Sequence, residues 1–163
     1  MELKQVEVVG IYLSSDRNYP VVLLREPGSD RFLPIWIGIF EANAIYLKME
    51  GLSYPRPLTN DLLRMVIQGL KARVTKVVID ELRDSTYYAK VIIEKDNELL
   101  RIDARPSDSI ALALGTDSPI FVSEDVLKTS VQLSPDLKDR PFKSNLAERV
   151  QKMDPGDLGR YKF

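Results

Sequence analysis

The sequence predicts an α+β fold in which two duplicated β-β-β-α units form a mixed or antiparallel sheet with helices packed on it, followed by a C-terminal helical extension. Segments that alternate in polarity, as strands do, come in two groups of three, and each third strand turns directly into a helical segment. The two turning segments, FLPIWIGIFEANAIYL and ELLRIDARPSDSIAL, superimpose with Ile37 on Ile102, Glu41 on Pro106 and Ile45 on Ile110. This repetition indicates a duplicated unit.

The first unit begins close to the N-terminus. Alternation predicts three strands, over 4–13, 19–26 and 31–38, and the Pro-Gly pair of EPGSD favours a turn between the last two. A helix is predicted over 41–51, with Gly51 as its stop. A proline-marked loop leads to an amphipathic helix over 60–70, whose apolar residues recur at helical spacing: Leu62, Leu63, Val66, Ile67 and Leu70.

The second unit follows the same order. Three strands are predicted over 73–82, 86–95 and 98–105, the last two joined in a tight hairpin by Asp96 and Asn97. A helix is predicted over 106–115, with Pro106 in its first position and Gly115 just past its end. Its residues from Ile110 to Leu114 are apolar on every side, which indicates burial. A short strand over 118–123 and a brief helix or turn follow.

The predicted domain organisation follows from a change in amino-acid composition near residue 131. Residues 1–130 are predicted to form one domain, since 163 residues suit a single core. Residues 131–163 are polar and proline-marked, and a short helix over 145–153 carries Leu146, Val150 and Met153 on one stripe. This stripe needs a partner, so we expect the extension to dock on the same domain.

Composition excludes several chemistries. The chain has no Cys and no His, which rules out disulfides, thiolate zinc sites, cysteine nucleophiles and the Ser-His-Asp triad. A hard cation such as Mg²⁺, held by oxygen ligands, remains compatible. The net charge is −1, so contact with nucleic acid would need a local basic patch. No secretory signal or membrane-length apolar run is visible, so a cytoplasmic location is expected.

Charged residues crowd the turn from the third strand of the second unit into its helix. Arg101, Asp103 and Arg105 share one face of the strand, and Asp108 lies in the first helical turn. In one interpretation these groups neutralise one another and satisfy the helix N-terminus, with Asp103 paired to Arg101 or Arg105. In the other, the helix N-terminus and an Arg bind phosphate while paired Asp residues hold a divalent cation.

A second charged cluster, YPRPLTND, resembles the first. Arg56 is fixed between two prolines, Thr59 is predicted to cap the helix that follows, and Asp61 lies in its first turn. Capping explains Thr59 and Asp61 but not Arg56, whose rigid loop suits a fixed contact. Glu41 opens the helix of the first unit, and Trp36 is expected in the core or in a subunit interface.

Four motifs in this order and spacing, LPIWIGIFEANAI, RPLTNDLL, TYYAKV and IDARPSDSIALAL followed by SPIFV, resemble the bifunctional nuclease domain family. The resemblance covers roughly residues 1–130, and the ending DPGDLGRYKF is similar to that of the family. It implies a compact α+β domain, often dimeric, that hydrolyses DNA and RNA. The polar motif positions it implies here are Glu41, Arg56, Thr59, Asp61, Asp103, Arg105, Ser107 and Asp108. Asn60 stands where the family commonly has His.

The resulting hypothesis is a carboxylate- and metal-dependent nuclease. Its catalytic residues are Asp103, Asp108, Arg105 and Asp61; Arg56, Thr59 and Ser107 bind the substrate; Asp103, Asp108 and Glu41 hold Mg²⁺. Such a site requires residues 56–61 to lie next to 103–108. The alternative is a non-catalytic dimeric module, whose Arg and Asp clusters are structural or bind a small anion. In either case we expect a homodimer.

Overall fold

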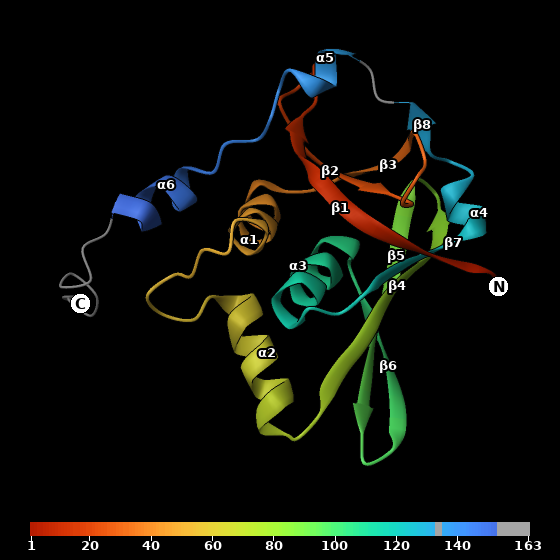
Figure 1. Cartoon of the computed structure of the whole chain (residues 1–163), viewed down its shortest axis with the longest axis vertical. Helices are drawn as coiled ribbons and strands as arrows, with labels where there is room; N and C mark the ends of the chain where they lie inside the picture. Colours follow the sequence, from red (N-terminus) through yellow and green to blue (C-terminus); the bar gives the residue numbers. More distant parts are fainter. Residues whose placement is uncertain (133–134, 153–163) are drawn as a thin grey trace.

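The structure is a computed structural model that describes residues 1–132 and 135–152. Within them, eight strands form one mixed sheet in the order β6-β5-β4-β7-β1-β2-β3-β8 (Figure 1). The strands are β1 (Leu3–Leu13), β2 (Pro20–Arg25), β3 (Arg31–Trp36), β4 (Arg73–Arg83), β5 (Thr86–Lys95), β6 (Glu98–Ala104), β7 (Ile120–Ser123) and β8 (Val131–Gln132). The helices are α1 (Ile39–Met49), α2 (Thr59–Gly69), α3 (Pro106–Thr116), α4 (Glu124–Leu127), α5 (Pro135–Lys138) and α6 (Asn145–Lys152). The predicted α+β fold is confirmed.

The two predicted units are present, each as an antiparallel three-stranded meander followed by a helix. Strand β7 lies between them, parallel to β4 and antiparallel to β1, and so joins both meanders into one sheet. The equivalence of the helices differs from the predicted one. Their first residues are Ile39 and Pro106, so Glu41 corresponds to Asp108 and not to Pro106.

Turn residues set the hairpins of the second unit. Asp96 and Asn97 both have positive φ, as a two-residue hairpin turn requires, and this predicted hairpin is confirmed. Asp84 and Ser85 adopt the same conformation between β4 and β5. Gly51, with φ of 63°, follows α1 as predicted. Gly115 lies inside the last turn of α3, whose left-handed cap is Asp117.

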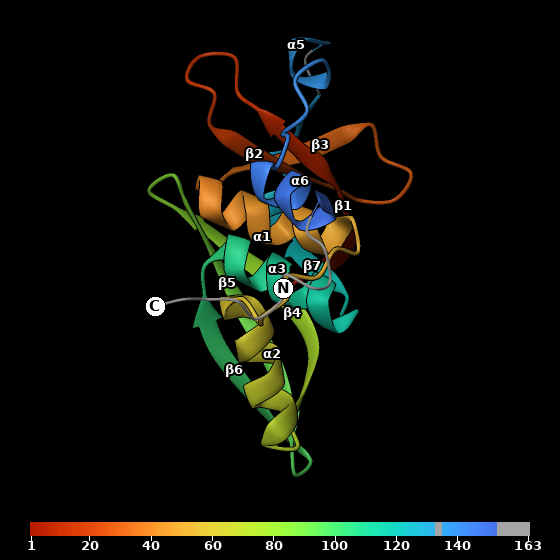
Figure 2. The same cartoon turned by 90° about the vertical axis from the view of Figure 1, so that its left-hand side faces the viewer.

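The core lies between the sheet and the helices. Figure 2 shows α1, α3 and α2 stacked over one face of the sheet. Helix α3 is the most buried of them, as its all-round apolar sequence predicts, and Ile110 and Leu112 are enclosed. Against it pack the inward side chains of the central strands, among them Val22, Leu24, Val77, Ile79 and Val122.

One local prediction is wrong, and two other features are more exposed than a core position would be. Thr59 is not the cap of α2: Leu58 takes the extended cap conformation, and Thr59 is the first helical residue. On α2 only Ile67 of the apolar stripe is buried, because the helix touches α3 and the start of β4 along one narrow side. Trp36 is 60% exposed, so it is not a core residue.

The described part of the C-terminal extension contacts the first unit. The backbone N–H of Phe142 donates to the carbonyl of Ile11 at 2.9 Å, and its buried ring meets Tyr46 of α1 edge-on. In α6, Ala147 is buried, whereas Met153 and the Val150 side chain lie outside the described residues. The division into domains at residue 130 stays a prediction. None of the described helices is long and apolar enough to cross a membrane.

Candidate functional site

The turns from β3 into α1 and from β6 into α3 lie side by side and form the candidate site. Gly38 and Arg105 occupy the same position in the two units, since each is the extended residue that caps its helix. Glu41 and Asp108 are likewise equivalent, each the third residue of its helix. A carboxylate at this position stabilises the positive end of the helix dipole. The duplication therefore brings two such carboxylates to one place.

Arg105 bridges the two carboxylates. Its Nε and Nη2 donate to Asp108 Oδ2 and Oδ1 at 2.9 and 3.2 Å, and its Nη1 donates to Glu41 Oε1 at 2.9 Å. The hydrogen bonds that Arg105 donates to Asp108, and then the one that it donates to Glu41, raise the pKa of the Arg105 guanidinium above its usual value. The Arg105 side chain is 64% exposed, so two of the five N–H groups of its guanidinium remain available to a ligand.

Gly38 lets Glu41 reach this position. A Cβ atom on Gly38 would collide with the Glu41 carboxylate, which folds back over the cap residue. Any larger residue at 38 would displace that carboxylate from Arg105. The geometry around Arg105 thus depends on a residue without a side chain.

A pocket of about 450 Å³ opens beside Arg105. Its walls come from both turns, from the β4–β5 turn and from the residue before β2: Tyr19, Ile35, Trp36, Ile37, Gly38, Glu41, Ser85, Thr86, Tyr87, Arg105, Pro106 and Ser107. Tyr19 and Trp36 are exposed aromatic side chains at its mouth. Exposed aromatic rings beside an Arg suit the stacking of nucleobases and the binding of phosphate.

Asp103 lies away from this pocket. It pairs in register with Lys90 of β5, whereas its neighbours Ile102 and Ala104 lie opposite Val91 and Ala89, which face the core. Asp103 is therefore on the sheet face turned away from the helices. Its side chain is exposed and makes no hydrogen bond or ion pair with the described residues.

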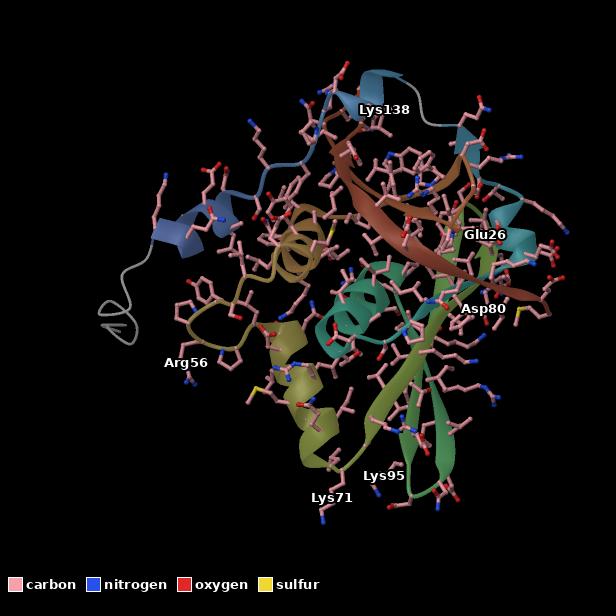
Figure 3. The ribbon with its side chains drawn as sticks, viewed as in Figure 1. Glu26, Arg56, Lys71, Asp80, Lys95 and Lys138 are labelled. Carbon is pink, nitrogen blue, oxygen red and sulfur yellow. The ribbon has the colours of Figure 1, made fainter. Side chains whose placement is uncertain are left out.

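Residues 56–61 are also separate from the pocket. Asp61 forms an ion pair with Lys48, in the last turn of α1, while Glu41 lies in the first turn of the same helix. Lys48 lies seven positions after Glu41, which corresponds to about 10 Å along the helix axis. Thr59 is exposed, and Arg56 extends from the α1–α2 loop into solvent (Figure 3). The structure thus does not bring residues 56–61 next to 103–108.

The surroundings of Asp61 indicate that it stabilises the fold rather than binds a ligand. Its side chain is 16% exposed, and it accepts from Lys48 Nζ and, at 3.2 Å, from the backbone N–H of Leu58. Burial disfavours the charged form, but the hydrogen bonds and the charge of Lys48 outweigh it and lower the pKa of Asp61. The hollow beside Asp61 and Asn60 has a volume of only about 10 Å³, too small for a ligand.

The predicted Mg²⁺ ligands do not fit a common metal site. Asp108 and Glu41 lie together, but both carboxylates accept from Arg105, and Asp103 is on the opposite face of the sheet. Among the described residues, no group of three carboxylates could hold a metal ion. A cation at this pocket would have to displace the Arg105 guanidinium.

Sequence reasoning missed the aromatic wall of the pocket. Trp36 was expected in the core or an interface, and the β4–β5 turn was not assigned to any site. One signal was present: Trp36 stands two residues before Gly38, and Tyr87 is the second residue of the TYYAKV motif. What could not be found in the sequence is that the β4–β5 turn reaches the β3–α1 turn.

Comparisons with known proteins agree on one family. The family model of the bifunctional nuclease domain matches residues 22–134. An uncharacterized protein of Mycobacterium tuberculosis is 46% identical over 135 residues, which cover 83% of this chain and 80% of that protein. Bifunctional nuclease 1 of Oryza sativa subsp. indica is 26% identical over 112 residues, covering 67% of this chain but 34% of the rice protein.

Proposed function

Because this chain belongs to the bifunctional nuclease domain family, we propose that it hydrolyses phosphodiester bonds of DNA, RNA or both in the pocket beside Arg105. The observation that carries the proposal is the pairing of an exposed guanidinium with exposed aromatic side chains around one pocket. The guanidinium suits a phosphate, and Trp36 suits a base next to it. This combination favours a single-stranded substrate, whose bases are available for stacking.

Each pocket residue has a distinct role in this proposal. The two remaining N–H groups of Arg105 stabilise the negative charge that develops on the phosphoryl oxygens. Glu41 lines the pocket and accepts a proton from the attacking water. The water oxygen bonds to phosphorus, the P–O bond to the leaving sugar oxygen breaks, and that oxygen takes up the proton. Asp108 positions Arg105 through its two hydrogen bonds, and the Ser107 hydroxyl donates to the substrate.

The other sequence-derived residues stay predictions. Asp103, Asp61, Arg56 and Thr59 lie outside the pocket lining, which argues against a shared reaction step. Mg²⁺ dependence, a cytoplasmic location and a homodimer are likewise predictions. No step of the proposed reaction is routed through a metal ion, because its predicted ligands do not converge.

A second candidate function is a binding module without catalysis. It is favoured by the charge of the cluster, since one guanidinium is already matched by two carboxylates. Such a cluster repels a phosphate more than an unpaired Arg does. In this reading the pocket binds a small anion or a strand without cleaving it.

The test is cleavage of labelled single-stranded DNA and RNA by the purified chain, with Mg²⁺ and with EDTA. We expect Arg105→Ala to lower the cleavage rate about 100-fold or more, as loss of one preorganised charge donor does. Arg105→Lys retains the charge but not the forked geometry, so it should recover little. The comparison of cleavage rates with Mg²⁺ and with EDTA shows separately whether the reaction depends on a divalent metal ion.

The matched control is Arg73→Ala, an exposed Arg at the other end of the β4–β5 hairpin, where it pairs with Glu94. This variant should cleave like the wild type. Equal cleavage by wild type and Arg105→Ala would indicate a contaminating nuclease and contradict the proposal. Binding of the strand without cleavage in every condition would favour the second candidate.

A further inference from the structure

A further pocket lies on the face of the sheet that points away from α1, α2 and α3. Figure 1 shows these three helices on one side of β4 and β5, and this pocket is on the other side. Its volume is about 290 Å³, and its walls come from the start of the chain and from β4, β5 and β6. We call it the open-face pocket; among its lining residues are Leu3, Lys76, Asp80, Lys90, Ile92 and Arg101.

Two cationic side chains flank one apolar residue of this pocket. Lys76 of β4 and Arg101 of β6 are both direct neighbours of Ile92 of β5 in the sheet register. Adjacent strands are about 4.8 Å apart, so the Cα atoms of the two cations are about 10 Å apart, and their long side chains can meet above Ile92. Neither forms an ion pair within the described part of the chain; the Lys76 ammonium lies 5.4 Å from the ring centre of Phe121.

A third cation and a buried acid complete the polar part of the pocket. Lys90 lies two residues before Ile92 on β5, and its ammonium group pairs with Asp80 Oδ2. Figure 3 shows Asp80 on the side of β4 away from α3. The Asp80 side chain is only 8% exposed, and its Oδ1 is enclosed without a hydrogen-bond donor from any described residue. Such an acceptor is unfavourable in a folded protein, so it marks a place where a donor is missing.

The floor of the pocket is apolar. Val78 and Ile92 are 5% and 6% exposed, although neither belongs to the core cluster between sheet and helices. Leu3 and Leu99 add to the same surface. Ligand pockets usually have volumes of about 300–1,000 Å³, so a pocket of 290 Å³ suits a small ligand. An apolar floor beneath a group of cations suits a ligand with one flat ring and one anionic group.

We propose that the open-face pocket binds a nucleoside monophosphate. The phosphate lies above Ile92 and accepts charge-assisted hydrogen bonds from Lys76 and Arg101. The base lies on Val78, and a ring N–H donates to Asp80 Oδ1 after a small shift of the flexible Lys90, whose side chain is 42% exposed. Guanine suits this contact because its N1 and its amino group both donate. The proposal does not depend on cleavage beside Arg105.

The surrounding charges favour a small ligand over a nucleic-acid strand. Carboxylates lie on both sides of the row formed by Lys76, Ile92 and Arg101: Asp103 is opposite Lys90, and Glu94 is opposite Leu99. The excess of positive charge is therefore confined to the pocket. The successive phosphates of a strand that crossed this face would approach these carboxylates, whereas a single phosphate avoids them.

The first experiment is calorimetric titration of the full chain with GMP, guanosine and inorganic phosphate. We expect a dissociation constant for GMP of about 100 μM or lower. Guanosine lacks the phosphate, and inorganic phosphate lacks the ring, so each should bind at least about tenfold more weakly. Inorganic phosphate that binds as tightly as GMP would contradict the role of the ring and overturn the proposal.

The second experiment repeats the titrations with variants. Lys76→Gln and Arg101→Gln should each weaken GMP binding about tenfold or more, because each removes a charged donor to the phosphate. The matched control is Lys95→Gln, on the same strand as Lys90 but outside the pocket lining, and it should bind GMP like the wild type. Thermal melts establish that each variant is folded.

Asp80→Asn separates the two ends of the ligand. The Asn amide directs its oxygen toward Lys90 and presents an N–H₂ group to the base, so GMP should bind about tenfold more weakly. Inorganic phosphate should bind no more weakly than to the wild type, since a negative charge has been removed. A folded Asp80→Asn variant with unchanged GMP affinity overturns the base contact.

The remaining outcomes locate the ligand. GMP affinity that is unchanged in Lys76→Gln and Arg101→Gln, or lost in Arg105→Ala, would assign the ligand to another pocket and overturn the proposal. A single strand of about 20 nucleotides serves as a competitor. If it displaces GMP at a lower concentration than a second mononucleotide does, and loses this advantage in Lys76→Gln, the face binds a strand and the proposal is wrong.

Discussion

Two charged clusters, each with a carboxylate in the first turn of a helix, have different environments. Arg105 with Asp108 and Glu41 lines a pocket of about 450 Å³ and is mostly exposed. Lys48 with Asp61 is enclosed beside a hollow of about 10 Å³. In both, the acid is the third residue of its helix. The difference teaches that residue type and spacing predict the ion pair, whereas exposure and adjoining space determine whether it can meet a ligand.

The largest effect should come from removing the enclosed acid. Asp61→Ala leaves Lys48 half-buried without a carboxylate and removes the acceptor of the Leu58 N–H, so we expect a loss of about 2–3 kcal/mol in the free energy of unfolding. Asp108→Ala, in the exposed cluster, should cost less than about 1 kcal/mol. Urea denaturation measures both. Equal losses would remove the distinction between the two clusters.

A smaller effect is expected at the aromatic mouth of the pocket. Trp36→Ala should weaken the binding of a labelled single strand about tenfold, because stacking of one base contributes about 1–3 kcal/mol. Fluorescence anisotropy measures the dissociation constant. Tyr88→Ala is the control, since this ring lies against Arg83 outside the pocket lining. Equal weakening in both variants would show that Trp36 has no special part in binding.

The pH dependence of stability tests the ion pair of the enclosed cluster. The lowered pKa of Asp61 means that its ion pair stabilises the fold fully above the ordinary carboxyl pKa of 3.8, and that this stabilisation is lost as pH falls through the folded-state pKa. The difference in unfolding free energy between wild type and Asp61→Asn should therefore be constant near neutral pH and narrow below pH 3.8. Urea titrations across this range measure it. A difference that widens on acidification would contradict the assigned pairing.

The smallest effect should follow from a single methyl group beside the exposed cluster. Gly38→Ala moves the Glu41 carboxylate away from Arg105, and cleavage should fall about threefold to tenfold while the dissociation constant of the strand does not rise. Its effect on unfolding should stay below about 1 kcal/mol. Gly69→Ala is the matched control, because an added Cβ there meets nothing. Unchanged cleavage in Gly38→Ala would show that Glu41 takes no part in the reaction.

Much of the fold was predictable because its signals are local. Alternation and turn residues such as Asp96-Asn97 depend on neighbouring positions, so seven strands were found within two residues of their observed ends. The insertion of β7 between β4 and β1 was not predictable, since it joins segments far apart in the chain. Helix α2 illustrates the same limit. Its apolar stripe predicted a helix correctly, but the stripe does not reveal what covers it, and within the described part of the chain only Ile67 of α2 is buried.

The candidate site was predictable only in part. Arg105 and Asp108 were placed at the same turn, but the expected ion pair joined Asp103 to Arg101 or Arg105, whereas Arg105 contacts Asp108 three residues along the chain. The contact with Glu41 joins the two units, and only the corrected helix equivalence explains it. Asp61 does cap the start of α2, since it accepts from the backbone N–H of Leu58, but its ion pair with Lys48 of the preceding helix could not be predicted from local spacing.

The central position of β7 has a consequence for biosynthesis. Ribosomes deliver the chain from its N-terminus, so both meanders emerge before the strand that lies between them. Until Ile120–Ser123 has left the exit tunnel, the inner edges of β1 and β4 have no neighbour and are open to wrong pairing. Closure of the sheet must therefore wait for a four-residue segment made late in translation, and a nascent chain that pauses before it is the form most in need of a chaperone.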